Sequence, residues 1–77
     1  MKRKKMTDFI TLVAMDLGMT PLGKKCGKYF NLMFTSDNCV VVESFEPNNT
    51  YGFTNINDLS DNDLEKIYND LYEDFGN

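Results

Sequence analysis

Residues 28–45 have the sequence KYFNLMFTSDNCVVVESF, in which two apolar runs flank a polar tripeptide. Residues 28–35 follow a period of two, which is typical of a strand that buries one face. Residues 39–45 are rich in β-branched side chains, and Ser-Asp-Asn at 36–38 is typical of a turn. The two runs therefore predict an antiparallel hairpin. The side chains expected to point from its first strand to the core are Phe30, Leu32 and Phe34.

The C-terminal segment has the strongest helical pattern of the chain, LSDNDLEKIYNDLYEDF at 59–75. Ser60 can accept a hydrogen bond from a free amide of the first turn, and Asp63 stands where a capping box has its acid. Apolar residues then recur at intervals of three and four, which predicts a helix over 61–75. Its apolar stripe consists of Leu64, Ile67, Tyr68, Leu71, Tyr72 and Phe75.

Weaker signals place the remaining elements. Residues 7–17 predict a first helix with Thr7 as its cap, and 19–27 predict a loop. Residues 51–56 predict a third strand with Gly52 as a candidate bulge. The predicted fold class is therefore α+β in the order α-β-β-β-α, a three-stranded antiparallel meander with two helices packed on one face.

This order and the length of the chain resemble the double-stranded RNA-binding domain. That family contacts the RNA backbone through lysines at the start of its last helix. The corresponding segment here is Ser-Asp-Asn-Asp-Leu-Glu at 60–65, which has acids where the family has its basic contacts. The resemblance therefore holds for the elements alone and implies no RNA binding.

The composition is that of one small globular domain. The chain has 77 residues, enough for a single core, and 42% of them are hydrophobic. We expect one domain over 1–77, in which 1–6 form a flexible basic tail. Charge is divided along the chain: residues 1–28 have seven of the eight basic side chains and two acids, whereas 29–77 have one basic side chain and ten acids.

Several kinds of chemistry lack their usual residues. The chain has no histidine, the commonest general base and metal ligand. Its two cysteines, Cys26 and Cys39, are too few for structural zinc, and the predicted hairpin places them roughly 30 Å apart, too far for a disulfide. The sequence therefore predicts no catalytic residue, metal or cofactor, and a binding protein rather than an enzyme. Because no apolar run is long enough for a membrane span or a signal peptide, a cytoplasmic location is expected.

Acids of the second helix form one candidate surface for a partner protein. A negative helix face can attract a basic partner. The alternative is a solvated face, in which Asp58, Asp61 and Asp63 stabilise the positive end of the helix. The candidate binding residues on this face are Asp63, Asp70, Glu73 and Asp74.

The sheet face opposite the helices is the second candidate surface. A contiguous exposed apolar patch there fits a partner protein or a homodimer. The alternative is an alternation shifted by one residue in the second strand, which would move Val41 and Phe45 into the core. The candidate residues on this face are Tyr29, Met33, Val41 and Phe45.

The basic N-terminal half suggests nucleic acid as a less favoured partner. Clustered lysines can neutralise phosphates, and Tyr29 offers a ring for stacking. The alternative is a solvated tail and loop, and the net charge of −4 opposes the approach of nucleic acid. The candidate residues are Lys4, Lys5, Lys24, Lys25 and Lys28.

The leading hypothesis is a small cytoplasmic module without enzymatic activity that binds another protein through the acidic helix or the exposed sheet face. By analogy, small acidic domains of this kind suit regulators or inhibitors of phages and mobile elements. The alternative function is nucleic-acid binding through the basic half. No interaction with a membrane is expected.

Overall fold

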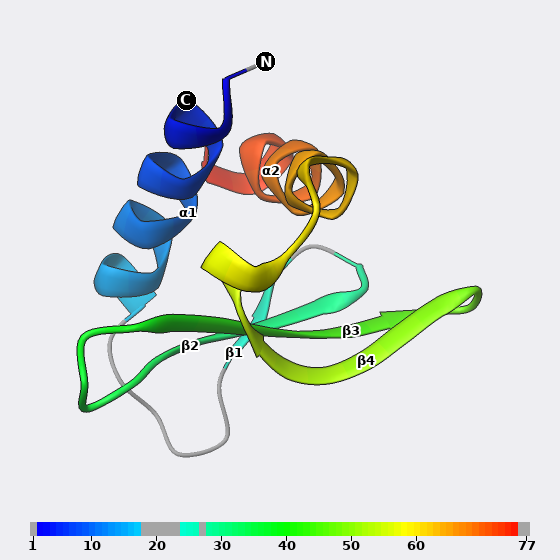
Figure 1. The fold of residues 1–77 in the computed structure, drawn as a ribbon, viewed down its shortest axis with the longest axis horizontal. Coiled ribbons are helices and arrows are strands. Elements are labelled where there is room, and N and C mark those ends of the chain that lie inside the picture. The colour runs from blue at the N-terminus through cyan, green and yellow to red at the C-terminus, as the bar shows by residue number, and fades with distance from the viewer. Residues whose placement is uncertain (1, 18–23, 27, 76–77) are drawn as a thin grey trace.

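A computed structural model of the protein describes residues 2–17, 24–26 and 28–75. A four-stranded antiparallel sheet has its strands in the order β1-β2-β3-β4, and both helices lie on the same side of it (Figure 1). In chain order the elements are α1 (Arg3–Leu17), β1 (Lys24–Cys26), β2 (Phe30–Phe34), β3 (Val40–Glu46), β4 (Asn49–Asn55), the 3-10 helix η1 (Ile56–Asp58) and α2 (Asp61–Phe75).

The predicted α+β fold, with two helices on one face of an antiparallel meander, is confirmed. The three predicted strands correspond to β2, β3 and β4, and the helix predicted over 61–75 has the bounds of α2. The short strand β1 was missed, because its three residues include two lysines and lack any alternation of apolar and polar residues. β1 pairs with β2 at one edge of the sheet, where Lys24 lies opposite Leu32 and Cys26 opposite Phe30.

The alternation predicted for the hairpin is also confirmed. Val42 lies opposite Leu32, and both are buried beneath the helices. Met33 lies opposite Val41 on the other face, so the alternative of a shifted second strand is wrong. The bulge expected at Gly52 is present, since the pairing of β3 with β4 shifts between Val42 and Ser44.

The helix α1 begins at Arg3, four residues before the predicted cap at Thr7. The hydroxyl of Thr7 instead donates a hydrogen bond to the Lys4 carbonyl at 3.1 Å, inside the helix. Residues 3–6 are therefore helical and do not form the predicted flexible tail. Met6 is 1% exposed in the core, and burial of its side chain extends the helix beyond what local sequence indicates.

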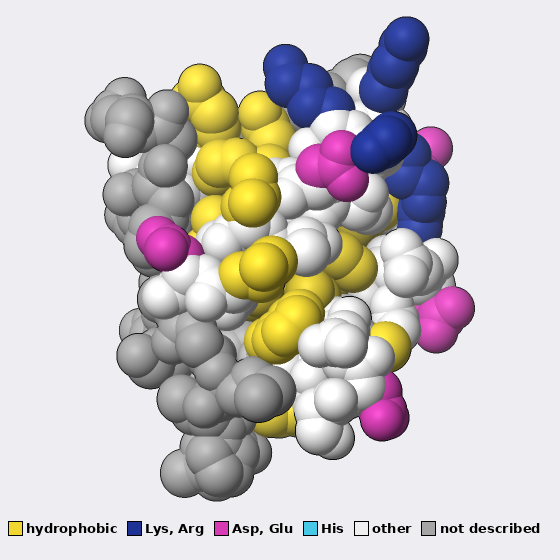
Figure 2. All heavy atoms as spheres, turned by 90° about the vertical axis from the view of Figure 1, so that its left-hand side faces the viewer, with side chains coloured by type: hydrophobic (Ala, Val, Ile, Leu, Met, Phe, Trp, Pro, Cys, Tyr) yellow, Lys and Arg dark blue, Asp and Glu magenta, His cyan; other side chains and the backbone are white. Residues whose placement is uncertain are grey.

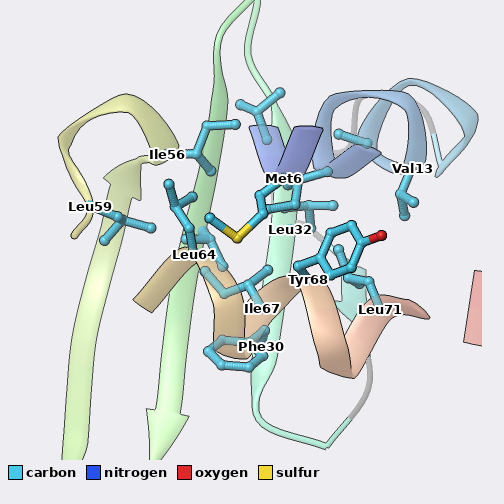
Figure 3. Close-up of a cluster of buried hydrophobic side chains, with 14 residues drawn as sticks. Met6, Val13, Phe30, Leu32, Ile56, Leu59, Leu64, Ile67, Tyr68 and Leu71 are labelled. Atoms are coloured by element: carbon cyan, nitrogen blue, oxygen red, sulfur yellow. The ribbon is translucent and has the colours of Figure 1, made fainter. Parts of the chain in front are cut away.

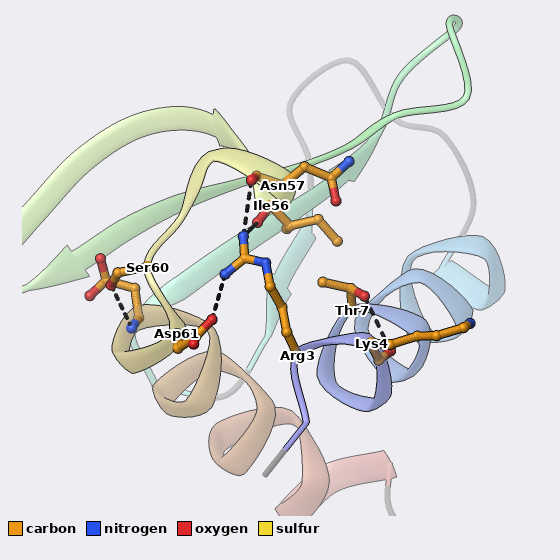
Figure 4. Close-up of polar contacts among 8 residues, drawn as sticks. Arg3, Lys4, Thr7, Ile56, Asn57, Ser60 and Asp61 are labelled. Atoms are coloured by element: carbon orange, nitrogen blue, oxygen red, sulfur yellow. Dashed lines mark hydrogen bonds and ion pairs between the residues drawn. The ribbon is translucent and has the colours of Figure 1, made fainter.

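Arg3 holds the start of α1 against the segment that leads into α2 (Figure 4). Its guanidinium donates hydrogen bonds to the Asp61 carboxylate at 2.7 Å and to the Asn57 carbonyl at 2.9 Å. A longer bond of 3.4 Å reaches the Ile56 carbonyl. One planar side chain thus satisfies the exposed carbonyls of η1 and contacts the first residue of α2.

The predicted cap of α2 is present, and its acid has a second role. The Ser60 hydroxyl accepts a hydrogen bond from the Asp63 amide at 3.1 Å, as expected of an N-cap. The Asp63 carboxylate accepts a hydrogen bond at 2.8 Å from the side-chain amide of Asn49, the first residue of β4. The start of α2 is therefore tied to the β3–β4 hairpin.

The core lies between the helices and the inner face of the sheet (Figure 3). Four of the six residues predicted for the apolar stripe of α2 are buried in it, whereas Tyr72 is about half exposed and the side chain of Phe75 lies outside the described part of the structure. The buried hydrophobic residues are Met6, Ile10, Val13, Ala14, Phe30, Leu32, Val40, Val42, Ile56, Leu59, Leu64, Ile67, Tyr68 and Leu71.

Cys39 is a free cysteine. The estimate of 30 Å between the two cysteines assumed one continuous strand, whereas β1 folds back on β2 and brings Cys26 opposite Phe30. Cys39 follows the Phe34–Val40 pair and bonds to Thr35, which is five residues further along the sheet than Phe30, or roughly 17 Å. That spacing still exceeds the range for a disulfide, about 4.4–6.8 Å between Cα atoms.

Neither helix, over the residues that the structure describes, is long and apolar enough to cross a membrane.

Candidate protein-binding surface

The outer face of the sheet is the face that no described helix covers (Figure 1). Its most exposed large side chains are Tyr29 at 40%, Phe45 at 52% and Phe53 at 42%. Met33 and Val41 are half-buried beside them. All four residues predicted for this face therefore lie on it or at its rim, and the structure adds Phe53.

The strand register arranges these side chains in two apolar groups. The Phe45 amide donates a hydrogen bond to the Tyr29 carbonyl at 2.7 Å, so these two residues are neighbours across β2 and β3. Met33 and Val41 form a directly opposite pair further along the same strands.

A polar pair separates the two apolar groups. The Asn31 side-chain amide donates a hydrogen bond to the Glu43 carboxylate at 3.2 Å between opposite positions of β2 and β3. An apolar surface with a fixed polar pair at its centre can select a partner through shape and through hydrogen bonding.

The sequence pattern did not predict Phe53 on the outer face, because the bulge reverses the direction of its side chain. In a regular strand Phe53 would share a face with Tyr51, which packs on the core. In β4 the register places Tyr51 opposite Ser44 and Thr54 opposite Val42, with both partners buried. The extra residue therefore leaves Phe53 on the outer face, and the only sequence signal for this was Gly52 itself.

The acidic candidates do not act as one free surface. The Asp70 carboxylate accepts a hydrogen bond from the Lys28 amide at 3.0 Å, and Asp63 is bonded to Asn49 as described above. Glu73 is exposed, and the side chain of Asp74 lies outside the described part of the structure. Asp63 and Asp70 therefore have structural partners, which connect α2 to two turns of the sheet.

The basic candidates occupy separate positions. Lys4 is exposed and forms an ion pair with Asp8 at 2.7 Å, one helical turn away. Lys5 and Lys28 are exposed, whereas the side chains of Lys24 and Lys25 are outside the described part. Figure 2 shows the basic side chains at the start of α1, with hydrophobic side chains gathered beside them.

A second apolar surface lies on the helices and was not predicted. Leu12 is 64% exposed on α1, and Tyr72 of α2 is about half exposed beside Phe9. An open pocket of about 330 Å³ is lined by Phe9, Leu12, Val13 and Asp16. It is a shallow hollow on the side of α1, and its one charged lining residue gives it little chemistry for recognising a ligand.

Tyr51 has an unusual environment at the inner face of β4. Its hydroxyl is shielded from solvent and has no hydrogen-bond partner among the described residues. Burial raises the pKa of Tyr51 from 10.0 to about 12, and the negative charges of Asp63 and Glu46 add to the shift. The neutral phenol is therefore strongly favoured in the folded protein.

Replacing Tyr51 by phenylalanine should raise the free energy of unfolding at neutral pH by about 1 kcal/mol, because it removes a buried hydroxyl without a partner. The folded-state pKa lies above the unfolded value, so the stability linked to this proton is complete below pH 10 and is lost as pH rises towards 12. Urea unfolding at several pH values should show that the free energy of unfolding falls less between pH 10 and 12 in Tyr51→Phe than in the original protein. If the free energy of unfolding of both proteins changed in parallel with pH, the link between stability and the Tyr51 proton would be contradicted.

No group of three or more acidic or cysteine side chains in the described ranges is placed to hold a metal ion. The chain matches no protein-family model and no curated protein, and its fold matches no solved structure.

Proposed function

We propose that this protein is a non-enzymatic module that binds another protein through the outer face of its sheet. The observation that supports this proposal is the group of half-exposed aromatic side chains on a face that no described helix covers, Tyr29, Phe45 and Phe53. Aromatic rings on a fixed backbone are typical of the residues that dominate binding energy in protein interfaces.

Physical arguments favour this face over the acidic helix. Each ring held on a paired strand loses little conformational freedom on binding, and burying its apolar area gains about 25 cal/mol per Å². Asp63 and Asp70, by contrast, already accept hydrogen bonds within the protein. These two acids therefore already stabilise the fold through their bonds to Asn49 and Lys28.

The proposed mode of action follows from the size of the chain. A domain of 77 residues whose binding face is one side of a sheet acts by occupying the surface of its partner. This is the format of a regulator or inhibitor, and within this proposal a phage or mobile-element origin and a cytoplasmic location fit the small acidic chain.

Replacing Phe45 by lysine should weaken binding of the partner by about 30-fold, equivalent to a hot-spot loss of about 2 kcal/mol. The measurement is capture of proteins by tagged variants from nuclease-treated lysate of the source cell, followed by titration of the captured protein. The matched controls are Leu12→Lys on the exposed side of α1 and Glu73→Lys on α2.

Both controls should capture the partner as well as the original protein does. Loss of capture in Glu73→Lys alone would assign binding to the acidic helix and reject the sheet face. Recovery that disappears on nuclease treatment would favour the nucleic-acid alternative.

A further inference from the structure

The free edge of β4 lies beside the outer face and is poorly protected against pairing with another chain. β4 is the last strand in the sheet order and spans Asn49–Asn55. Its sequence, NTYGFTN, has neither a charged residue nor a proline, and of the features that usually prevent edge strands from pairing it contains the bulge at Gly52, beyond the regular pairs of residues 49–51. The described part of the chain places no further strand against it.

The hydrogen-bond pattern identifies backbone groups that point out from this edge. The Phe45 amide bonds to Tyr29, so it points towards β2 and away from β4. Phe45 and Thr50 are directly opposite and therefore form a pair without mutual backbone bonds. The amide and carbonyl of Thr50 consequently point away from β3, where an added strand can bond to them.

The two faces of the edge differ in chemistry. On the outer face, Phe53 lies on the edge strand β4 and Phe45 lies on the neighbouring strand β3, so the apolar surface extends from the edge across the sheet. On the inner face, Glu46 lies opposite Asn49, whose side chain bonds to the Asp63 carboxylate.

The inner side of this edge is net negative. Asp58 is exposed at the end of η1, directly after β4. Lys66 lies 4.0 Å from Glu46, and Arg3 is paired with Asp61, so two basic groups face four acids. The acids are Glu46, Asp58, Asp61 and Asp63.

We infer that β4 binds an extended segment of a partner protein as an added strand, in which apolar side chains on the outer face alternate with lysine or arginine on the inner face. The backbone of the segment bonds to Thr50, its apolar side chains contact Phe53, and its basic side chains lie near Asp58 and Asp63. This inference rests on the proposed function, because the segment continues the outer face.

A second copy of this chain fits the edge less well. Its own β4 has no basic residue to place near the acids, and pairing of two β4 edges would bring two negative inner sides together. The complementary occupant is therefore a basic, alternating segment of a different protein.

The probe is a capped eight-residue peptide of alternating valine and lysine, titrated into the full-length protein and followed by NMR and amide hydrogen exchange. We expect saturable binding and slower exchange of the Thr50 amide. A peptide with glutamate in place of lysine, and one N-methylated at alternate amides, should each bind at least about tenfold more weakly. Equal binding of either control peptide would overturn the inference, and this comparison requires no variant of the protein.

The variant Thr50→Pro tests the edge of β4 independently of the outer face. It removes a backbone amide that points out from the edge and leaves the aromatic side chains in place. Peptide binding should fall by at least about tenfold, and capture of the natural partner should fall with it. If Phe45→Lys abolishes capture and a folded Thr50→Pro variant does not, the edge inference fails while the proposed function holds. A concentration-dependent dimer that Thr50→Pro abolishes would also overturn the inference, because the edge would then pair with a second copy.

Discussion

Replacing Ile67 by alanine is expected to lower the free energy of unfolding by about 2–5 kcal/mol. Ile67 is fully buried on α2, in the cluster that joins both helices to the sheet (Figure 3). The variant loses the transfer free energy of the removed carbons and leaves a cavity that close-packed neighbours fill only in part.

The effect is large relative to the total stability of so small a domain. At about 0.05–0.15 kcal/mol per residue, 77 residues correspond to roughly 4–12 kcal/mol. Urea unfolding followed by far-UV circular dichroism should show a lower midpoint with an unchanged slope. Glu65→Ala, at an exposed position of the same helix, is the matched control and should change stability by less than about 0.5 kcal/mol. A similarly small change for Ile67→Ala would contradict the described core.

Removal of residues 1–6 is expected to cost at least about 3 kcal/mol, and it tests directly whether this segment is a tail. The truncation deletes Met6 from the core and removes the Arg3 bonds to Asn57 and Asp61 (Figure 4). It leaves buried apolar surface of α2 and the carbonyls of η1 without their partners. The thermal midpoint of the truncated chain should therefore fall by many degrees.

The control retains the helix and removes only exposed charge. Replacing Lys2, Lys4 and Lys5 by glutamine eliminates the exposed Lys4–Asp8 pair and also removes positive charge from a helix N-terminus, where it is unfavourable. These effects oppose each other, so stability should change by less than about 1 kcal/mol. A truncated chain as stable as this variant would show that 1–6 contribute nothing to the fold.

The parts of the fold that follow from local pattern were predictable. The alternation over 28–35, the turn at 36–38 and the β-branched run over 39–45 depend on chain geometry alone, and they produced the correct hairpin and the correct faces. The helix α2 followed from its cap at Ser60 and its apolar spacing.

The parts that failed depend on distant contacts. The Arg3 interactions join residues 53 to 58 positions apart in the chain, and no local pattern marks them. β1 exists because β2 offers a partner edge, since three residues have little strand preference of their own.

The residues of the candidate site were also predictable where local pattern sets their direction and unpredictable where distant contacts do. Local alternation was sufficient to place Met33, Val41 and Phe45 on the outer face, because side-chain direction in a regular strand is fixed by parity. Phe53 required the bulge, whose effect on direction depends on the register with β3. Asp63 and Asp70 were expected on a free acidic face, yet tertiary packing gave them partners in Asn49 and Lys28.

The fold class, the α2 helix and the inner and outer faces of the hairpin thus follow from local sequence, because periodicity and capping act between residues close in the chain. The start of α1, the set of acids without a structural partner and the uncharged edge of β4 beside an aromatic face are instead results of packing. Those features depend on which surfaces meet when helices and strands pack, and packing joins residues that the sequence separates.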